Sequence, residues 1–122
     1  MEWLRISTSN ELVRVATDEI VFVRADGNYS DLMLTNGKCR KMTFQIHFFD
    51  ETFQRLRRNM FVRVGRSLIV NKRYIYVINL SEQIIQFAGQ SIKTEIPSVR
   101  VSREALKLLK TQLESEKGGD NE

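Results

Sequence analysis

Cysteine, histidine and proline are scarce, with one residue of each among 122. Cys39 has no partner for an internal disulfide, and His47 alone cannot complete a zinc site with it. We therefore expect no metal and no cofactor, and we expect Cys39 to be a strand residue without chemistry. No apolar run approaches the length of a membrane span, and the N-terminus lacks a signal-peptide pattern. The expected location is the cytoplasm, and no membrane-spanning segment is expected.

Motifs of the common enzyme classes are also missing. The sequence has no glycine-rich phosphate loop, no arrangement typical of a Ser-His-Asp triad, and no H-x-E or C-x-x-C pattern. Asp26 and Asp31 are close together, but they flank a turn signal, where aspartate usually bonds to the backbone. We therefore expect no catalytic residue and no enzymatic activity.

Positive charge is what the chain has in excess, with 19 basic and 15 acidic residues and a formal net charge of +4. The last nine residues, 114–122, hold four acidic residues against one lysine, so residues 1–113 are more basic than the whole chain. We expect residues 1–113 to form one domain and residues 114–122 to be an acidic, disordered tail.

A long central stretch, from Thr52 to Ser81, contains no Asp or Glu. Such a stretch cannot neutralise its own cations locally, so it should attract an anionic partner. Nucleic acid is the leading partner class, and an anionic protein or a membrane surface stays open. Four cations are expected to act mainly through long-range electrostatic attraction rather than direct contact: Arg57, Arg58, Lys72 and Arg73.

Hydrophobic periodicity predicts a mostly β chain with one internal helix and one C-terminal helix. The internal helix should place Phe44, Phe48 or Phe49, Phe53 and Leu56 on one face, with Thr43 or Asp50 as its cap and Asn59 at its end. The C-terminal helix should begin at an N-cap, Ser102, and bury a leucine stripe (106, 109 and 113). Strands are expected over residues 3–6, 11–16, 20–23, 29–34, 38–42, 61–64, 68–70, 73–78, 84–87 and 92–96, the last two forming a hairpin through 88–90.

Three short segments carry polar or cationic side chains where the chain turns. Each has an ordinary structural reading, as a plain turn, a solvated strand or a capped helix, and each also suits a nucleic acid. Amide and hydroxyl groups can reach base edges, and guanidinium groups suit guanine and phosphate. The candidate residues are Asn28, Tyr29 and Ser30, then Arg63, Arg66 and Ser67, and finally Arg100 and Arg103.

Three separated motifs give a more specific indication. The run from Phe61 to Asn71 resembles the signature of the LytTR DNA-binding domain, commonly F-x-R-V-H-R-S-(F/Y)-(I/V)-V-N. Residues 20–29 are similar to that family's I-x-(Y/F)-(I/V)-E-x-x-x-x-Y segment, and residues 96–100 resemble its closing I-P-V-S-R. The resemblance covers roughly residues 3–113.

The resemblance implies a bacterial, sequence-specific transcription regulator. In this family, small antiparallel sheets and short helices present loops that enter successive major grooves of direct-repeat sites and bend the DNA. Carried over by motif position, the DNA-facing residues are Asn28, Tyr29 or Ser30, Arg63 and Arg66, and Arg100. Arg103 also fits the last motif, because that motif is stretched here. A second protomer on the DNA and a signalling partner protein are further implied partners.

Two residues depart from the family pattern. Gly65 stands where the family usually has histidine, and Arg24 replaces a frequent acidic residue. The family's usual receiver domain is also not expected in this chain, so binding would be constitutive, set by protein amount, or controlled by a partner. The alternative function is a protein-interaction module that keeps the fold without binding DNA, and RNA binding is a weaker third.

Overall fold

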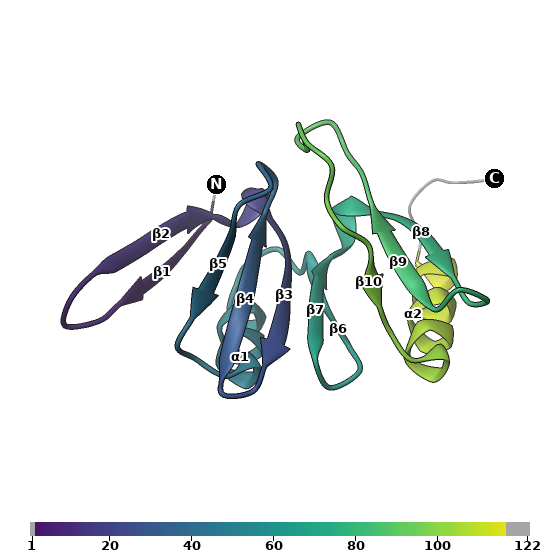
Figure 1. The fold of residues 1–122 in the computed structure, drawn as a ribbon, viewed down its shortest axis with the longest axis horizontal. Helices are drawn as coiled ribbons and strands as arrows, with labels where there is room; N and C mark the ends of the chain where they lie inside the picture. Colours follow the sequence, from purple (N-terminus) through teal and green to yellow (C-terminus); the bar gives the residue numbers. More distant parts are fainter. Residues whose placement is uncertain (1, 117–122) are drawn as a thin grey trace.

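The computed structural model describes residues 2–116, and it contains three separate antiparallel sheets and two α-helices (Figure 1). Short 3-10 turns at Thr17–Glu19 and Lys72–Tyr74 link neighbouring strands. The elements are β1 (Trp3–Ser7), β2 (Leu12–Ala16), β3 (Ile20–Asp26), β4 (Tyr29–Leu34), β5 (Cys39–Met42), α1 (Ile46–Gln54), β6 (Phe61–Val64), β7 (Leu68–Asn71), β8 (Ile75–Asn79), β9 (Ile84–Phe87), β10 (Val99–Arg100) and α2 (Arg103–Ser115). The predicted fold class, mostly β with an internal and a C-terminal helix, is confirmed.

A five-stranded sheet in the order β5-β4-β3-β7-β6 forms the centre of the molecule. Its middle strand begins with Ile20-Val21-Phe22-Val23, whose side chains are all at most 1% exposed. A continuous apolar run is what a strand needs when both of its faces are covered. The central sheet is therefore buried on both sides, as the run predicted.

Each face of the central sheet contributes to its own hydrophobic core. On one face, α1 and the β1–β2 hairpin cover a cluster that includes Leu4, Val23, Phe49 and Ile69. On the other face, the sheet β10-β9-β8 and α2 cover a cluster that includes Val21, Val70, Ile85 and Leu106. Neighbouring residues of β7, Ile69 and Val70, enter different clusters because side chains alternate along a strand.

The predicted hairpin between residues 84–87 and 92–96 is wrong. β9 pairs instead with β8 on one side and with β10 on the other, in a register that places Val99 opposite Ile85. The apolar residues that suggested a strand, Ile92 and Ile96, pack against the core rather than alternating along a ladder. Segment 88–98 is thus a loop that runs out from β9 and returns to β10, and the strand forms only after Pro97 (Figure 1).

The helix boundaries differ from the sequence expectation at several points. α1 begins after Gln45, which makes no side-chain capping bond, so neither Thr43 nor Asp50 is its cap. It ends at Gln54, well before Asn59. α2 begins after Ser102 as expected and runs to Ser115, so Glu114 of the predicted tail is helical. Residues 117–122 of that tail lie outside the described residues.

Within residues 2–116, no helix is both long enough and apolar enough to cross a membrane. Cys39 is an exposed residue at the start of β5. The same described part of the chain has no group of three acidic, His or Cys side chains placed to hold a metal ion.

Candidate nucleic-acid interface

Three connections that are distant in the sequence meet at one edge of the molecule. They are the β3–β4 turn, the β6–β7 turn and the β10–α2 connection, which all lie along the lower edge in Figure 1. The first two touch directly, because the backbone N–H of Ala25 donates to the carbonyl of Ser67 at 2.8 Å. The second also faces the start of α2, since a Cβ built on Gly65 would lie 3.5 Å from that of Ala105. We call this edge the turn edge.

In the β3–β4 turn, two of the three predicted residues are exposed. Tyr29 is 47% exposed, and the Asn28 side-chain oxygen accepts a hydrogen bond from the Gln45 amide at 3.0 Å. Ser30 is fully buried, and its hydroxyl donates to the carbonyl of Phe44 at 2.8 Å. The side chain of Ser30 therefore points inward and ties β4 to the segment before α1, which leaves Asn28 and Tyr29 as the exposed candidates of this turn.

A lysine from the neighbouring strand supports this first turn. The Lys41 ammonium on β5 lies 2.6 Å from a carboxylate oxygen of Asp26 and 2.9 Å from one of Asp31. It also lies 5.9 Å from the centre of the Tyr29 ring. The hydrogen bond from Lys41 lowers the pKa of Asp26, and the bonds to Asp26 and Asp31 raise the pKa of Lys41. The carboxylates near the turn edge are thus partly neutralised.

The β6–β7 turn is a three-residue connection, because Val64 pairs with Leu68. Its first residue, Gly65, has a φ of +65°, which lies in the left-handed region. Arg66 and Ser67 follow and are exposed. The side chain of Arg66 makes no ion pair or hydrogen bond with other residues of the described chain.

Arg63, in contrast, has two partners within the protein. Its guanidinium lies 2.9 Å from a carboxylate oxygen of Asp50, and it donates to the backbone carbonyl of Arg66 at 2.7 Å. The two arginines of the signature therefore differ. Arg66 is exposed on the turn without a side-chain partner among residues 2–116, whereas Arg63 is bonded to Asp50 and to the turn backbone.

The β10–α2 connection brings Arg100 and Arg103 to the third position on the turn edge. The Arg100 guanidinium donates to the carbonyl of Glu82 at 3.4 Å, and that of Arg103 to the carbonyl of Leu80 at 3.1 Å. Both arginines therefore contact the β8–β9 turn, and both remain exposed. Ser102 caps the helix between them, accepting from the N–H of Ala105 at 3.2 Å.

The four cations expected to act by long-range electrostatic attraction do not lie at the turn edge. Lys72 and Arg73 follow β7 at the end opposite its turn, and the N–H of Lys72 donates to the Met60 carbonyl. The backbone N–H groups of Arg57 and Arg58 donate to the Glu2 carboxylate at 2.8 and 3.2 Å. These hydrogen bonds lower the pKa of Glu2, the bond from Arg57 being the largest cause.

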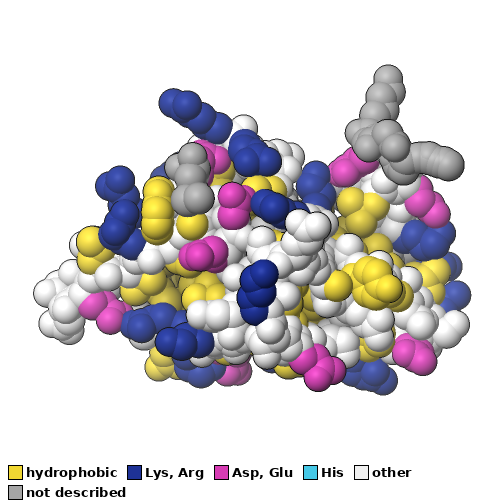
Figure 2. All heavy atoms as spheres, turned by 90° about the horizontal axis from the view of Figure 1, so that it is seen from above, with side chains coloured by type: hydrophobic (Ala, Val, Ile, Leu, Met, Phe, Trp, Pro, Cys, Tyr) yellow, Lys and Arg dark blue, Asp and Glu magenta, His cyan; other side chains and the backbone are white. Residues whose placement is uncertain are grey.

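Acidic residues from other parts of the chain neutralise much of the acid-free stretch. Lys72 lies 3.0 Å from Glu116, and Arg73 lies 3.6 Å from Asp18. Figure 2 looks onto the edge opposite the turn edge and shows Lys and Arg interspersed with Asp and Glu. Three of the seven cations of the stretch, Arg63, Lys72 and Arg73, thus meet carboxylates from outside it. The expectation of an unpaired cationic run is wrong for these three, while no ion pair within the described residues involves the other four.

Asn71, the last residue of the signature, has a structural role that the sequence reading missed. It is fully buried, its amide donates to the Ile20 carbonyl at 3.0 Å, and its oxygen accepts from the N–H of Arg73 at 3.0 Å. It thereby joins β7 to the start of β3. Asp50 and Lys41 were also missed as partners, because neither is near its partner in the sequence.

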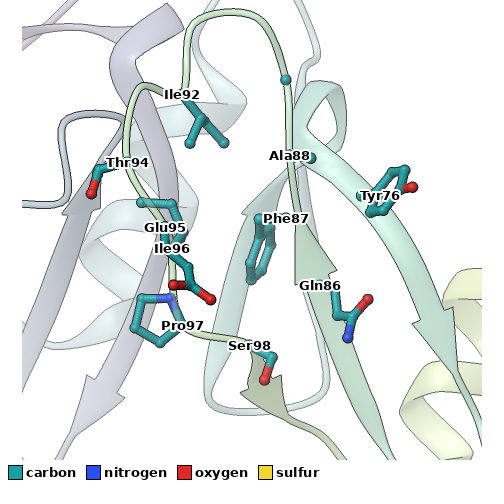
Figure 3. Close-up of a pocket in the computed structure, with 11 residues that line it drawn as sticks. Tyr76, Gln86, Phe87, Ala88, Ile92, Thr94, Glu95, Ile96, Pro97 and Ser98 are labelled. Carbon is teal, nitrogen blue, oxygen red and sulfur yellow. The ribbon is translucent and has the colours of Figure 1, made fainter.

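An open hollow of about 820 Å³ lies away from these turns (Figure 3). It is formed between the β8–β9 strands and segment 92–98, with Phe87, Ile92 and Ile96 as apolar lining. Gly89 at its rim packs closely on the Tyr74 ring, which a built Cβ would approach to 2.8 Å. None of the predicted contact residues lines this hollow.

Comparisons with known proteins agree on the family. The model of the LytTr DNA-binding domain family matches residues 10–114. The chain is similar in structure to the LytTr DNA-binding domain of a protein described as a methyl-accepting/DNA response regulator from Bacillus cereus, with a TM-score of 0.64 and 16% identity over 93% of this chain and 97% of that chain. At this identity the likeness concerns the fold. No curated protein matches the sequence.

Proposed function

The chain belongs to the LytTr DNA-binding domain family, and on that premise we propose that it regulates transcription by reading duplex DNA with its turn edge. The observation that carries this proposal is the meeting of three family motifs at one edge. The turns within or directly after these motifs are residues 27–28, 65–67 and 101–102, and they lie along one edge although they are far apart in the sequence. Turns projecting from a sheet are narrow enough to enter a major groove.

Each turn supplies a different kind of contact. Arg66 is the strongest candidate for a guanine or phosphate contact, because its guanidinium is exposed and has no partner in the described chain. Tyr29 and Asn28 offer a hydroxyl and an amide beside it, and Ser67 offers a hydroxyl. Arg100 and Arg103 flank the start of a 13-residue helix, where free backbone N–H groups also favour phosphate.

The cations on the opposite edge act at longer range in this proposal. Arg57, Arg58, Lys72 and Arg73 lie away from the turn edge, and two of them are paired with carboxylates. They add to the net positive charge that raises the encounter rate with DNA, rather than touching bases. Substituting them should change the salt dependence more than the sequence preference.

The finer features of the family belong to the same proposal. Direct-repeat sites would place two protomers side by side on the DNA, each inserting its turns into successive major grooves. The protein would act in the cytoplasm of a bacterium, where its DNA is.

Selection of duplexes from a randomised library by the wild-type protein tests the proposal. We expect an enriched duplex, and we expect the logarithm of its association constant, measured by fluorescence anisotropy, to fall linearly with the logarithm of the salt concentration. An RNA of the same sequence should compete poorly. No enriched duplex, or no salt dependence, would contradict DNA recognition.

Single substitutions then test the residue assignment on the selected duplex. Arg66→Ala should cost about 1–3 kcal/mol and relax the preference at one base pair if the contact is bidentate to guanine. Arg5→Ala on the β1–β2 hairpin is the matched control, since it removes an exposed arginine away from the turns. Equal effects of the two substitutions would exclude Arg66 as a specific contact.

One observation favours the alternative of a protein-interaction module. Three arginines of the candidate set, Arg63, Arg100 and Arg103, already bond to groups within the protein. If these bonds persist in every complex, the edge offers fewer free guanidiniums to DNA. A stable complex with a protein partner, together with absence of duplex selection, would favour this alternative.

A further inference from the structure

The ion pair beneath the β6–β7 turn holds the backbone of the turn itself. The Arg63 guanidinium uses one nitrogen for the Asp50 carboxylate at 2.9 Å and another for the Arg66 carbonyl at 2.7 Å. Only about a third of the Arg63 side chain and a quarter of that of Asp50 are exposed. Arg63 therefore bridges α1 to the middle residue of the turn.

Two hydrogen bonds from outside the turn hold its backbone. The Ser67 carbonyl accepts a hydrogen bond from the N–H of Ala25 on β3 at 2.8 Å. The Arg66 carbonyl accepts one from the guanidinium of Arg63. Gly65 gives the turn a residue with a freer backbone than any other, so external attachments matter more here than in an ordinary turn.

Asp50 is itself held on a firmly packed element. It lies in the middle of α1, whose Phe49 and Phe53 are 0% and 4% exposed. Phe53 stacks on Phe61 at the start of β6, with ring centres 4.0 Å apart. The helix that carries Asp50 and the strand that carries Arg63 are thus fixed relative to each other.

We propose that Asp50 is a positioning residue for DNA recognition, which acts through Arg63 to set the turn that presents Arg66. This inference rests on the proposed function. Arg63 is then a brace rather than a DNA contact, and the side chain that meets the DNA is that of Arg66. Family membership alone does not separate the roles of the two arginines, whereas their contacts in the fold do.

The direction in which one substitution changes DNA affinity distinguishes a positioning role from a simple effect of charge. Asp50 carries a negative charge near a surface that would meet a polyanion, so charge alone predicts tighter binding for Asp50→Asn. Positioning predicts the opposite, because the neutral amide holds the guanidinium less firmly and the turn loses its fixed geometry. The same reasoning predicts a lower affinity for the specific duplex and no loss of affinity for non-specific DNA.

The test uses the full chain, the duplex that the wild-type protein selects, and poly(dI-dC) as the non-specific duplex. We expect Asp50→Asn to weaken binding of the selected duplex about tenfold, a typical loss for one bidentate contact. Binding of poly(dI-dC) should be unchanged or tighter. Glu51→Gln is the matched control: it removes a charge from the adjacent position of α1, at a residue without an ion pair in the described chain. It should leave both affinities unchanged or slightly tighter.

Arg63→Lys gives a second, independent variant. Lysine keeps the positive charge but cannot bridge a carboxylate and a carbonyl with a planar fork. If Arg63 holds the turn by this bridge, lysine cannot replace it. The variant should therefore lose affinity for the selected duplex, as Asp50→Asn does. The double variant should be no weaker than either single one, since both break the same bridge.

The outcomes distinguish this inference from the proposed function. If the wild-type protein selects no duplex, the proposed function fails. If it selects one and Asp50→Asn binds that duplex as tightly as wild type or tighter, the positioning role is overturned and the proposed function stands. Retained specificity in Arg63→Lys, or additive losses in the double variant, would also overturn it. Thermal unfolding of each variant confirms that it is folded.

Discussion

At the scale of single residues, the cations of the turn edge differ in what surrounds them. Arg63 and Lys41 are bonded to carboxylates, Arg100 and Arg103 to backbone carbonyls, and Arg66 to none of the described residues. A guanidinium without a partner gives up only water when it meets DNA, whereas a paired one must first break its bond. Arg66 is therefore the most available cation at this edge.

The backbone of Gly65 leads to a prediction about stability. Its φ of +65° disfavours residues with a Cβ, although the space beside it is open enough for ordinary contact with Ala105. We expect Gly65→Ala to destabilise the protein by about 1 kcal/mol and Gly65→Val by more, with Gly65→Asn the mildest. Urea unfolding measures these differences.

Ser67→Ala in the same turn is the control for Gly65, and it should change stability little. A Gly65→Ala protein as stable as wild type would show that the turn changes its backbone without cost. The family's usual histidine at this position should fall near asparagine in this series, because both tolerate the left-handed region better than most residues.

The pairing of Lys41 with Asp26 predicts a dependence on pH. The lowered pKa of Asp26 means that the folded state favours its ionised form. The pairing therefore stabilises the fold above the ordinary titration range of aspartate and is lost as pH falls through the lowered pKa. We expect Lys41→Met to return the Asp26 pKa to its ordinary value, measured by NMR titration of the carboxyl carbon.

Lys38→Met serves as the comparison, because Lys38 is an exposed lysine near β5 that makes no ion pair with Asp26. It should leave the Asp26 pKa unchanged. An unaltered Asp26 pKa in Lys41→Met would mean that the ion pair does not form in solution.

At the scale of elements, the start of α2 connects stability to the turn edge. The cap at Ser102 satisfies a helix N–H while holding Arg100 and Arg103 on either side of it. We expect Ser102→Ala to destabilise the protein by about 1 kcal/mol, measured by thermal or urea unfolding. Ser115→Ala at the other end of the helix should cost clearly less; equal costs would argue against a capping role.

The elements also show where periodicity is a reliable guide. Strands with a strong apolar pattern, such as β3, β4 and β6, form where the pattern predicts them. Segment 92–96 does not form a strand, although Ile92 and Ile96 pack against the core. The edge of β9 that it would have to pair with is occupied by β10. Pairing partners are chosen by competition among strands, which a local pattern does not contain.

At the scale of the whole molecule, the central sheet is shared by two cores. Loss of packing on one face should therefore weaken the sheet that supports the other. We expect Leu106→Ala, a fully buried residue of α2, to destabilise the protein by about 2–5 kcal/mol while unfolding remains a single transition.

A local probe and a global probe measure this cooperativity. Trp3 is the only tryptophan and lies on the β1–β2 hairpin, while far-UV circular dichroism reports the helices. Their transitions should coincide in Leu106→Ala. Leu108→Ala, at a residue 74% exposed on the same helix, should change stability by no more than about 0.5 kcal/mol. Separate transitions would indicate two independently folding halves.

Much of the fold and the regions of the candidate interface could be predicted from the chain alone. Apolar runs and alternation specify the strands and the leucine stripe of α2, because burial depends on the chemistry of neighbouring residues in the chain. The motifs around Asn28, Arg66 and Arg100 indicated three turns. Domain boundaries and individual contact residues stay predictions.

Which side chains are free to act was decided only by the tertiary structure. Ser30 turns inward, Arg63 binds Asp50, and Lys72 of the acid-free stretch meets Glu116 from the far end of α2. Burial and ion pairing depend on distances in space, and residues far apart in sequence become neighbours only when the sheets pack. Composition and local pattern therefore determine what the chain can form, and packing determines which charges are left to meet a partner.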